Sequence, residues 1–217
     1  MGFSDLFFDR RCCLCDKHID KGAVCSECDS KLVSLIRIRK RRLGDVAENV
    51  ELYYLFDYDE PIVKKLLFRL KRSANSDLFK YASRLYYMAV PEDFSGTVVI
   101  CPRRKKSLRD YGYDHVEKPC ALMCKAHKER LSFERLLKRK GRSKEQKNLT
   151  LSQRKENTKG IFRVTKKDIP ENILLVDDVV TTASTINSCV DELFKCRSDA
   201  KIVAVCLASR NAFAGKG

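Results

Sequence analysis

Two adjacent carboxylates, Asp177 and Asp178, directly follow a run of apolar residues, and this arrangement constrains the fold more than any other in the chain. The run from Ile173 to Val176 predicts a buried strand of a parallel sheet. Hydroxyl side chains come next, and then a helix whose apolar residues recur at helical spacing. Acids and hydroxyls at the carboxyl end of such a strand lie where open α/β sheets bind ligands. We therefore expect an α/β fold with a mainly parallel sheet and helices on both faces.

The hydroxyl-rich turn after this strand suits a phosphate monoester. The following helix adds unpaired backbone N–H groups and the positive end of its dipole. Because carboxylates repel phosphate, the two acids should face vicinal sugar hydroxyls or a magnesium ion that carries a diphosphate. An ordinary helix capped by Thr or Ser after an acidic strand end is the alternative. The hydroxyls are those of Thr181, Thr182, Ser184 and Thr185.

This segment resembles the phosphoribosyl-diphosphate (PRPP) binding motif of the type I phosphoribosyltransferases. The resemblance implies that Asp177 and Asp178 bind the ribose diol and that residues 181–185 enclose the 5-phosphate. The loop glycine usual in this motif is Ala183 here, which a negative φ accommodates and a positive φ would strain. Thr181 occupies the position where several purine enzymes of the superfamily carry an acid, and it offers no obvious group for proton transfer.

Two Cys-x2-Cys pairs near the amino terminus predict a structural zinc site. Paired knuckles at this spacing direct four sulfur atoms at one tetrahedral point. Disulfides are disfavoured because no secretory signal precedes the cysteines, and Cys13 or His18 could replace a ligand, although neither fits the paired spacing. The segment is too small to have its own core, so metal binding should fold it. The expected ligands are Cys12, Cys15, Cys25 and Cys28.

Composition predicts a soluble cytoplasmic protein without membrane insertion. The 217 residues suffice for one sizeable α/β domain and a small appendage, and no apolar run approaches the length of a membrane span. The 44 Lys and Arg residues exceed the 29 Asp and Glu residues, which gives a formal net charge of +15 and favours polyanionic partners. A solvated basic surface would give the same balance.

The positive charge gathers in three clusters. The first follows the cysteine segment, and a solvated basic face explains it equally well. The second follows the expected strand at 97–101 and should border the ligand cleft, with Arg103, Arg104 and Arg109 as candidates for binding a diphosphate. The third is either a mobile loop able to close over a diphosphate or a strip that binds a nucleic-acid backbone. The clusters contain Arg37, Arg39, Lys40, Arg41 and Arg42; Arg103 to Lys106; and Lys138, Arg139, Lys140, Arg142, Lys144 and Lys147.

Apolar spacing predicts two helices between the cysteine segment and the second cluster. One covers 61–71 after several acids, as the amino end of a helix prefers, and the other covers 78–86. Lys71 could approach the ligand, but its spacing does not place it. Further strands are expected at 97–101, 172–176 and 201–207, with a crossover helix at 182–196.

Nearly the whole chain is similar to the ComF family of ComFC-like and GntX-like proteins. Five blocks match in order, and the block Leu108–His115 departs from the family pattern by carrying Tyr111, Asp114 and His115 in place of Arg, Asn and Gln. The other blocks are the four cysteines; the helix ending at Lys71; Cys101-Pro102-Arg103; the series Arg139, Gln146, Leu151, Arg154, Asn157, Gly160 and Phe162; and the PRPP motif.

The resemblance implies a zinc ribbon at residues 1–35 and a phosphoribosyltransferase-like domain at 36–217. It also implies a protein that binds PRPP with Mg²⁺ and takes part in natural transformation by handling incoming single-stranded DNA. A competence helicase and DNA-channel proteins would be its partners. The alternative is an active phosphoribosyltransferase with an unknown acceptor, in which Asp177, Asp178, Arg103 and Arg109 would be the catalytic residues.

Overall fold

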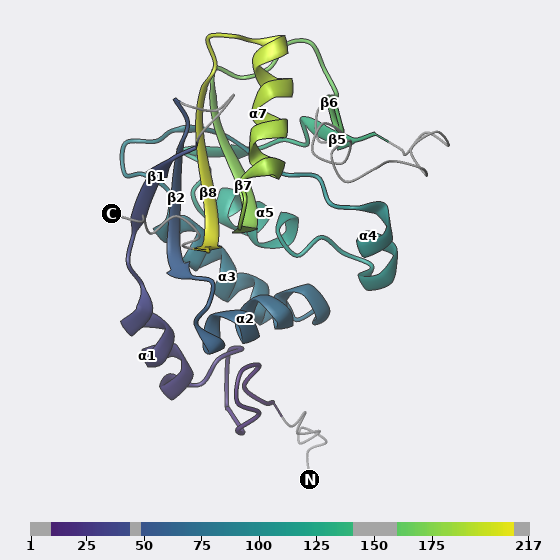
Figure 1. The fold of residues 1–217 in the computed structure, drawn as a ribbon. Coiled ribbons are helices and arrows are strands. Elements are labelled where there is room, and N and C mark those ends of the chain that lie inside the picture. Colours follow the sequence, from purple (N-terminus) through teal and green to yellow (C-terminus); the bar gives the residue numbers. More distant parts are fainter. Residues whose placement is uncertain (1–9, 44–48, 141–159, 211–217) are drawn as a thin grey trace.

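The fold is built on one six-stranded, mainly parallel sheet (Figure 1). The computed structural model describes residues 10–43, 49–140 and 160–210. Every neighbouring pair in the sheet is parallel except the antiparallel pair at the β1 edge. The expected α/β class with a mainly parallel sheet is therefore confirmed. In spatial order the strands are β1 (Arg39–Arg42), β2 (Glu51–Asp57), β8 (Lys201–Ser209), β7 (Asn172–Val180), β3 (Gly96–Ile100) and β4 (Leu131–Phe133).

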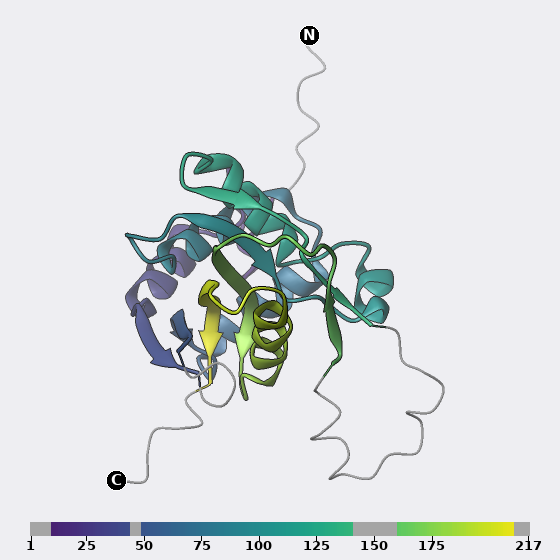
Figure 2. The same cartoon turned by 90° about the horizontal axis from the view of Figure 1, so that it is seen from above.

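Helices cover both faces of this sheet, which explains why its central strands are apolar almost throughout. On one face, α7 (Ser184–Cys196) buries Ile186, Val190 and Leu193. Helices of the other core cluster pack on the opposite face, and they include α2 (Pro61–Arg72), α3 (Ser76–Met88) and α5 (Glu117–Ala126). Figure 2 shows α7 on one side of β7 and β8 and the teal helices on the other.

The predicted strands and crossover helix are present, but one strand is longer than expected. Strand β7 continues through the two acids to Val180 instead of ending at Val176, with Asp177 still in register with Cys206 of β8. The sheet reaches past the acids because β8 also extends, to Ser209, and keeps the backbone paired. The crossover helix begins at Ser184.

Both predicted helices before β3 are also present. Helix α2 (Pro61–Arg72) starts with proline at its first turn, where the missing N–H costs nothing. Helix α3 (Ser76–Met88) starts at Asn75, whose side chain accepts a hydrogen bond from the Leu78 N–H. In Figure 1 the arrowheads of β2, β7 and β8 end near these helices, so the carboxyl edge of the sheet faces them.

The cysteine segment packs against the body of the protein. Two residues that precede α1 (Ser26–Leu35), Cys12 and Leu14, are buried in the same apolar cluster as α2 and α3. Leu32 of α1 is buried there as well. Polar contacts join the two parts as well: the Tyr81 hydroxyl donates to Asp29 at 2.8 Å. The cysteine segment therefore shares its core with the α/β body.

The third basic cluster is only partly described. Strand β5 (Leu137–Arg139) pairs antiparallel with β6 (Phe162–Val164), and the Arg139 guanidinium lies over the Phe162 ring, 5.3 Å from its centroid. The rest of this cluster and its family-like series lie outside the described residues: Gly141, Arg142, Lys144, Gln146, Lys147, Leu151, Arg154 and Asn157.

Candidate functional site

The two acids of β7 share one guanidinium. Arg103, which follows β3, places its Nη2 atom 3.0 Å from Asp177 Oδ1 and 2.9 Å from Asp178 Oδ1. Both carboxylates are buried, with 6% and 4% of their residue surfaces exposed. Because β3 and β7 are adjacent parallel strands, the residues after β3 and the end of β7 meet at the same edge of the sheet. The structure thus brings together three of the residues predicted to form the site.

Two more basic side chains reach Asp178. The Lys71 Nζ atom, near the end of α2, lies 2.8 Å from Asp178 Oδ2, and His115 Nε2 lies 3.1 Å from the same oxygen. The other oxygen accepts a hydrogen bond from the Val179 N–H at 2.8 Å. Sequence spacing left Lys71 unplaced, and His115 drew attention only as a departure from the family pattern.

These contacts move the pKa values of the two acids in opposite directions. Burial raises the pKa of Asp177 to about 7, although the Arg103 guanidinium acts to lower it. Burial also acts to raise the pKa of Asp178, but Arg103, His115 and Lys71 outweigh it and hold that pKa well below its ordinary value. Asp178 is therefore the permanently ionised member of the pair.

The hydroxyl-rich turn forms a small cavity beside the acids. The cavity has a volume of about 80 Å³ and is lined by Asp177, Val180 and the run from Thr181 to Ile186. The Thr182 and Ser184 hydroxyls lie 3.1 Å apart. Ala183 at the start of α7 has no side chain that could cap the helix, so within the described residues the N–H groups of the first turn can bind an anion. The turn predicted to enclose a phosphate therefore surrounds a hollow of limited size.

Ala183 in this turn has φ of +57°. This is the left-handed conformation that the sequence analysis identified as straining an alanine, and it costs about 1–2 kcal/mol relative to the right-handed one. Backbone strain held in place by its surroundings is common in ligand-binding turns.

The other two predicted cations do not touch the acids in the described contacts. Arg104 is the exposed residue before α4 (Lys105–Tyr111), and Arg109 is exposed on the same helix. The helix ends at Gly112, whose φ of +72° suits glycine. Tyr113 follows and donates from its hydroxyl to the Leu70 carbonyl at 2.9 Å, which ties this segment to the end of α2.

The four predicted cysteines form a cluster that could hold one metal ion. Their Sγ atoms all lie within 4.8 Å of one another, close to the separation of about 3.8 Å in a tetrahedral zinc site with Zn–S bonds of about 2.3 Å. Burial raises the pKa of Cys12, but N–H groups of Cys25, Leu14 and Cys15 that point at its sulfur lower that pKa to about 7. Four cysteine sulfur atoms at these separations match the donor set of a structural zinc site. The members are Cys12, Cys15, Cys25 and Cys28.

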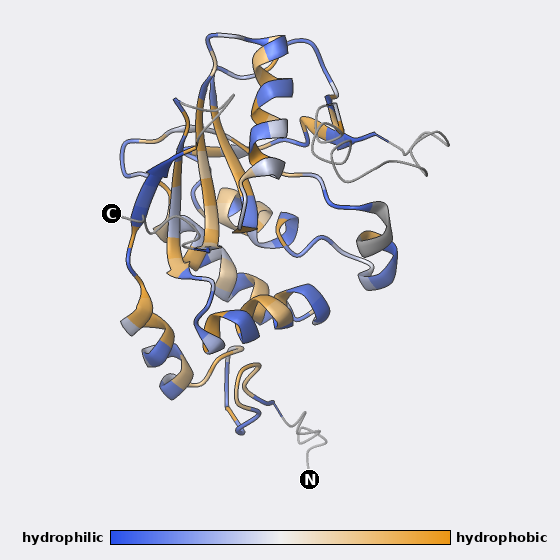
Figure 3. Ribbon diagram, in the orientation of Figure 1, coloured by the Kyte–Doolittle hydropathy of each residue, from blue (hydrophilic) through white to orange (hydrophobic). Residues whose placement is uncertain are grey.

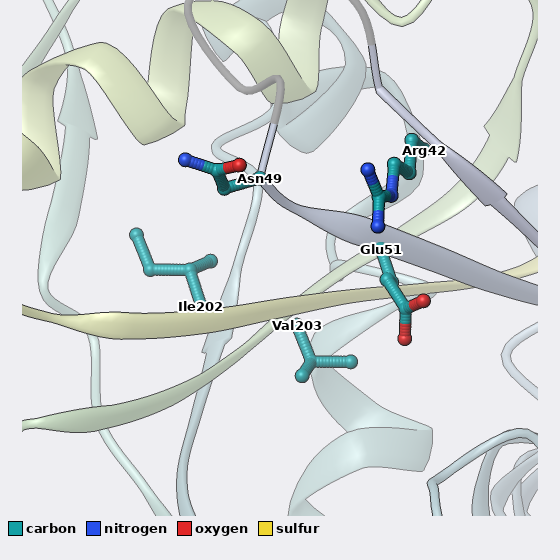
Figure 4. Close-up of a pocket in the computed structure, with 5 residues that line it drawn as sticks. All are labelled: Arg42, Asn49, Glu51, Ile202 and Val203. Carbon is teal, nitrogen blue, oxygen red and sulfur yellow. The ribbon is translucent and has the colours of Figure 1, made fainter.

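A second hollow lies at the opposite edge of the sheet. It measures about 260 Å³ and is surrounded by side chains near the amino ends of β2 and β8, as Figure 4 shows. It lies far along the strands from the acid pair, and its lining mixes two charged side chains, one amide and two aliphatic side chains: Arg42, Glu51, Asn49, Ile202 and Val203. This chemistry indicates no particular ligand.

Five solved chains match this protein in structure, and one of them is an orotate phosphoribosyltransferase. An orotate phosphoribosyltransferase from Aeropyrum pernix has 17% sequence identity and a TM-score of 0.37, over 87% of this chain and 83% of that chain. At these values the similarity does not establish a shared activity. No family model matches the chain, and no curated protein sequence matches it. In the part of the chain that the structure describes, every helix lacks the combination of length and apolarity that crossing a membrane requires.

Proposed function

We propose that this chain binds PRPP at the carboxyl edge of its sheet. The observation that carries the proposal is that three features lie together at the end of one strand. They are two buried acids, the two cations that pair with them, and a turn that lines a cavity of a size that suits an anion. PRPP has the matching groups: a diol, a diphosphate and a 5-phosphate. Phosphate alone would use only the turn, and a sugar alone would use only the acids.

Binding would exchange partners within this cluster. In the structure Arg103 and Lys71 neutralise the charges of Asp177 and Asp178. A ribose diol donates hydrogen bonds to carboxylates, and a diphosphate accepts charge-assisted hydrogen bonds from guanidinium and ammonium groups. A ligand with both groups can therefore separate the ion pairs and leave no buried charge without a partner.

Magnesium would arrive with the ligand. Both acids are engaged by protein cations, so the diphosphate oxygens would supply most of its ligands, as is usual for this ion. When bound, Mg²⁺ neutralises charge on a departing diphosphate. We propose that Arg103 and Lys71 hold the diphosphate, that Arg104 and Arg109 lie near enough in sequence to join them, and that Asp177 and Asp178 hold the sugar in place. Transfer of phosphoribose to an acceptor would then be the enzymatic alternative.

Calorimetric titration of Mg²⁺ and PRPP tests the binding proposal. We expect saturable binding that Asp177→Asn with Asp178→Asn weakens by at least about tenfold, since each lost charge-assisted hydrogen bond is worth about 1.5–3 kcal/mol. Asp93→Asn, a change of an exposed acid, is the matched control and should bind normally. Ribose 5-phosphate should bind more weakly than PRPP because it leaves the cations unsatisfied. Absence of PRPP binding by the wild type would end the proposal.

We also propose the role that the ComF resemblance implies, in natural transformation. What supports it is the net charge of +15 and the exposed basic residues on α2 and α4, which include Lys64, Lys65, Arg72 and Arg109. Phe68 is 48% exposed among them, with the Arg72 guanidinium 4.3 Å from its ring centroid, and an exposed aromatic ring can stack on a base. A competence helicase and DNA-channel proteins would be the partners.

Fluorescence anisotropy with a labelled single-stranded oligonucleotide tests this role. Affinity should fall steeply as salt increases, and Phe68→Ala should weaken binding by about 1–3 kcal/mol while leaving the salt slope unchanged. Asp177→Asn should leave DNA binding intact. Weak binding with no salt dependence would contradict the proposal.

For the four-cysteine cluster we propose zinc in a structural role. Four thiolates leave no coordination position open for a substrate, which is the pattern of structural sites. Metal analysis of protein purified without chelators should find about one zinc per chain.

A further inference from the structure

Strand β1 divides four consecutive basic residues between the two faces of the sheet. Arg39 is in register with Tyr54 and Arg41 with Leu52, and residues opposite each other in an antiparallel pair share a face. Tyr54 and Leu52 belong to the core cluster of α7, so Arg39 and Arg41 lie on the α7 face. Lys40 and Arg42 alternate to the other face and are exposed. Figure 3 shows β1 as a hydrophilic strand at the edge of an otherwise largely apolar sheet.

The two arginines on the α7 face lack sufficient partners. Arg39 Nη1 and Arg41 Nε are buried and have no hydrogen-bond partner among the residues that the structure describes. The contact from Arg41 Nη2 to the Ser209 hydroxyl is long, at 3.4 Å. Among residues 10–43, 49–140 and 160–210 no carboxylate lies within 4.0 Å of either guanidinium. Two half-buried cations on one face of a strand, each with a buried N–H group left unpaired, are unfavourable, and such groups normally have a partner.

The missing partner should be an anion near the phosphate turn. Ser209, which Arg41 approaches, is in register with Val180 and donates from its hydroxyl to the Val180 carbonyl at 3.1 Å. Val180 lines the turn cavity. Both arginine residues are half-buried and not fully enclosed, so we expect a small ligand to be able to reach them.

We propose that Arg39 and Arg41 form an oxyanion site that binds a phosphate group of a phosphorylated small molecule. A guanidinium presents paired donors that match phosphate oxygens, and two of them can hold one dianion. The inference goes beyond the PRPP proposal because it requires neither a ribose nor a diphosphate, and none of the residues of the acid pair takes part. The site extends the cationic surface of the cleft to the opposite flank of the turn.

The test uses the alternation of the strand as its control. The variant R39Q/R41Q removes two charges from the α7 face, and K40Q/R42Q removes two from the other face. Binding of inorganic phosphate, ribose 5-phosphate and PRPP is measured by titration calorimetry. We expect R39Q/R41Q to weaken inorganic phosphate binding by about tenfold or more and K40Q/R42Q to leave it unchanged. Asp178→Asn should also leave inorganic phosphate binding unchanged, which separates this site from the PRPP proposal.

The possible outcomes decide the proposal. Equal phosphate binding by R39Q/R41Q and the wild type would overturn it, as would a wild type that binds none of the three probes. A single-stranded oligonucleotide that loses affinity in R39Q/R41Q, while the small probes do not bind, would assign the arginines to a polynucleotide and also overturn it. If R39Q/R41Q does not fold, R39K/R41K replaces it: the charge remains but the paired donors are lost, and phosphate should then stabilise the wild type against heat more than this variant.

Discussion

The Lys71 ammonium lies 2.8 Å from a carboxylate oxygen of Asp178, which joins the end of α2 to the acid pair of β7. Lys71 is 40% exposed at its side chain, whereas that of Asp178 is 5% exposed. The lysine therefore can leave the acid for a ligand in the cleft, while the acid stays in place. If the Lys71 ammonium leaves Asp178 to pair with a diphosphate, replacing this lysine should weaken the binding of PRPP more than the binding of ribose 5-phosphate.

We expect Lys71→Gln to weaken PRPP binding by about 1.5–3 kcal/mol, the value of a hydrogen bond to a charged group. Ribose 5-phosphate affinity should change far less. Lys65→Gln on the exposed side of the same helix is the control. Calorimetry on the three proteins makes the comparison, and equal losses for both ligands would show that Lys71 acts through the sugar end or the fold.

The raised pKa of Asp177 predicts a pH dependence of stability. Its pKa is about 7 in the folded protein and about 3.9 in an unfolded chain, so the folded state binds this proton more tightly. Its contribution to stability is present below about pH 4 and is lost as pH rises to about 7, a loss of about 4 kcal/mol. Urea unfolding of wild type and Asp177→Asn between pH 4 and 8 measures it. As pH rises from 4 to 8, the free energy of unfolding of the wild type should fall relative to that of Asp177→Asn. A difference between the two proteins that stays constant with pH would contradict the raised pKa.

Asp178 should act in the opposite direction and at lower pH. Because its folded pKa is held well below the ordinary value, its contribution is present above about pH 4 and is lost as pH falls further. Above about pH 5 this carboxyl is ionised in both the folded and the unfolded chain and adds little to the slope, so the difference between wild type and Asp177→Asn there reports on Asp177.

The left-handed Ala183 predicts a stabilising substitution. Ala183→Gly should relieve the strain of φ +57° and raise the free energy of unfolding by about 0.5–1 kcal/mol, after allowing for the greater freedom of glycine in the unfolded chain. Chemical denaturation checks this. Ala→Gly at Ala82, in the middle of α3 with ordinary helical geometry, should instead destabilise.

Tyr86 predicts a second substitution without a penalty. Its hydroxyl is buried and has no hydrogen-bond partner in the described chain, and burial raises the pKa of this phenol well above its ordinary value. Tyr86→Phe removes an unsatisfied group and keeps the ring, so stability should be unchanged or rise by up to about 1 kcal/mol. A loss above about 1 kcal/mol in thermal unfolding would mean that the hydroxyl has a bound water or ligand as partner.

Loss of metal from the cysteine cluster should destabilise parts of the protein beyond the cysteine segment. Cys12 and Leu32 share one apolar cluster with α2 and α3, and Arg69 of α2 lies 3.3 Å from Asp16 of the knuckle. Cys25→Ser or a chelator should therefore lower the melting temperature of the whole chain. Cys196→Ser, a change of an exposed cysteine on α7, is the control and should have no effect. Hydrogen exchange that increases only within residues 12–28 would show that the segment unfolds alone.

Sequence periodicity predicted the elements whose patterns are local. The strands at β3, β7 and β8 and helices α2, α3 and α7 appear near their expected bounds because each carries its own apolar period. Arg103 was predicted to border the ligand cleft because it follows a strand end, and the structure adds that it lies beside the acids. The longer β7 was missed, since the apolar run stops at the acids although the pairing with β8 continues.

The remaining site residues depend on contacts that no local pattern encodes. Lys71 reaches Asp178 only because α2 packs under the carboxyl edge of the sheet, and Arg41 approaches Ser209 only because β1 pairs with β2. Within the run of basic residues at β1, the alternation of faces becomes visible only when the register is known. In the sequence the four basic residues look equivalent. In the sheet Arg39 and Arg41 lie on the α7 face, whereas Lys40 and Arg42 lie on the other face and are exposed.

The order of the sheet also bears on how the protein is made. Strand β8 lies between β2 and β7, yet it follows every other described strand in the sequence. Until β8 has been synthesised, β2 and β7 each expose an unpaired, apolar edge to the cell, which is a hazard for aggregation. Folding of the sheet therefore waits for the last strand to emerge, and a ribosome that stalls or a message that ends shortly before β8 would release a chain that depends on chaperones.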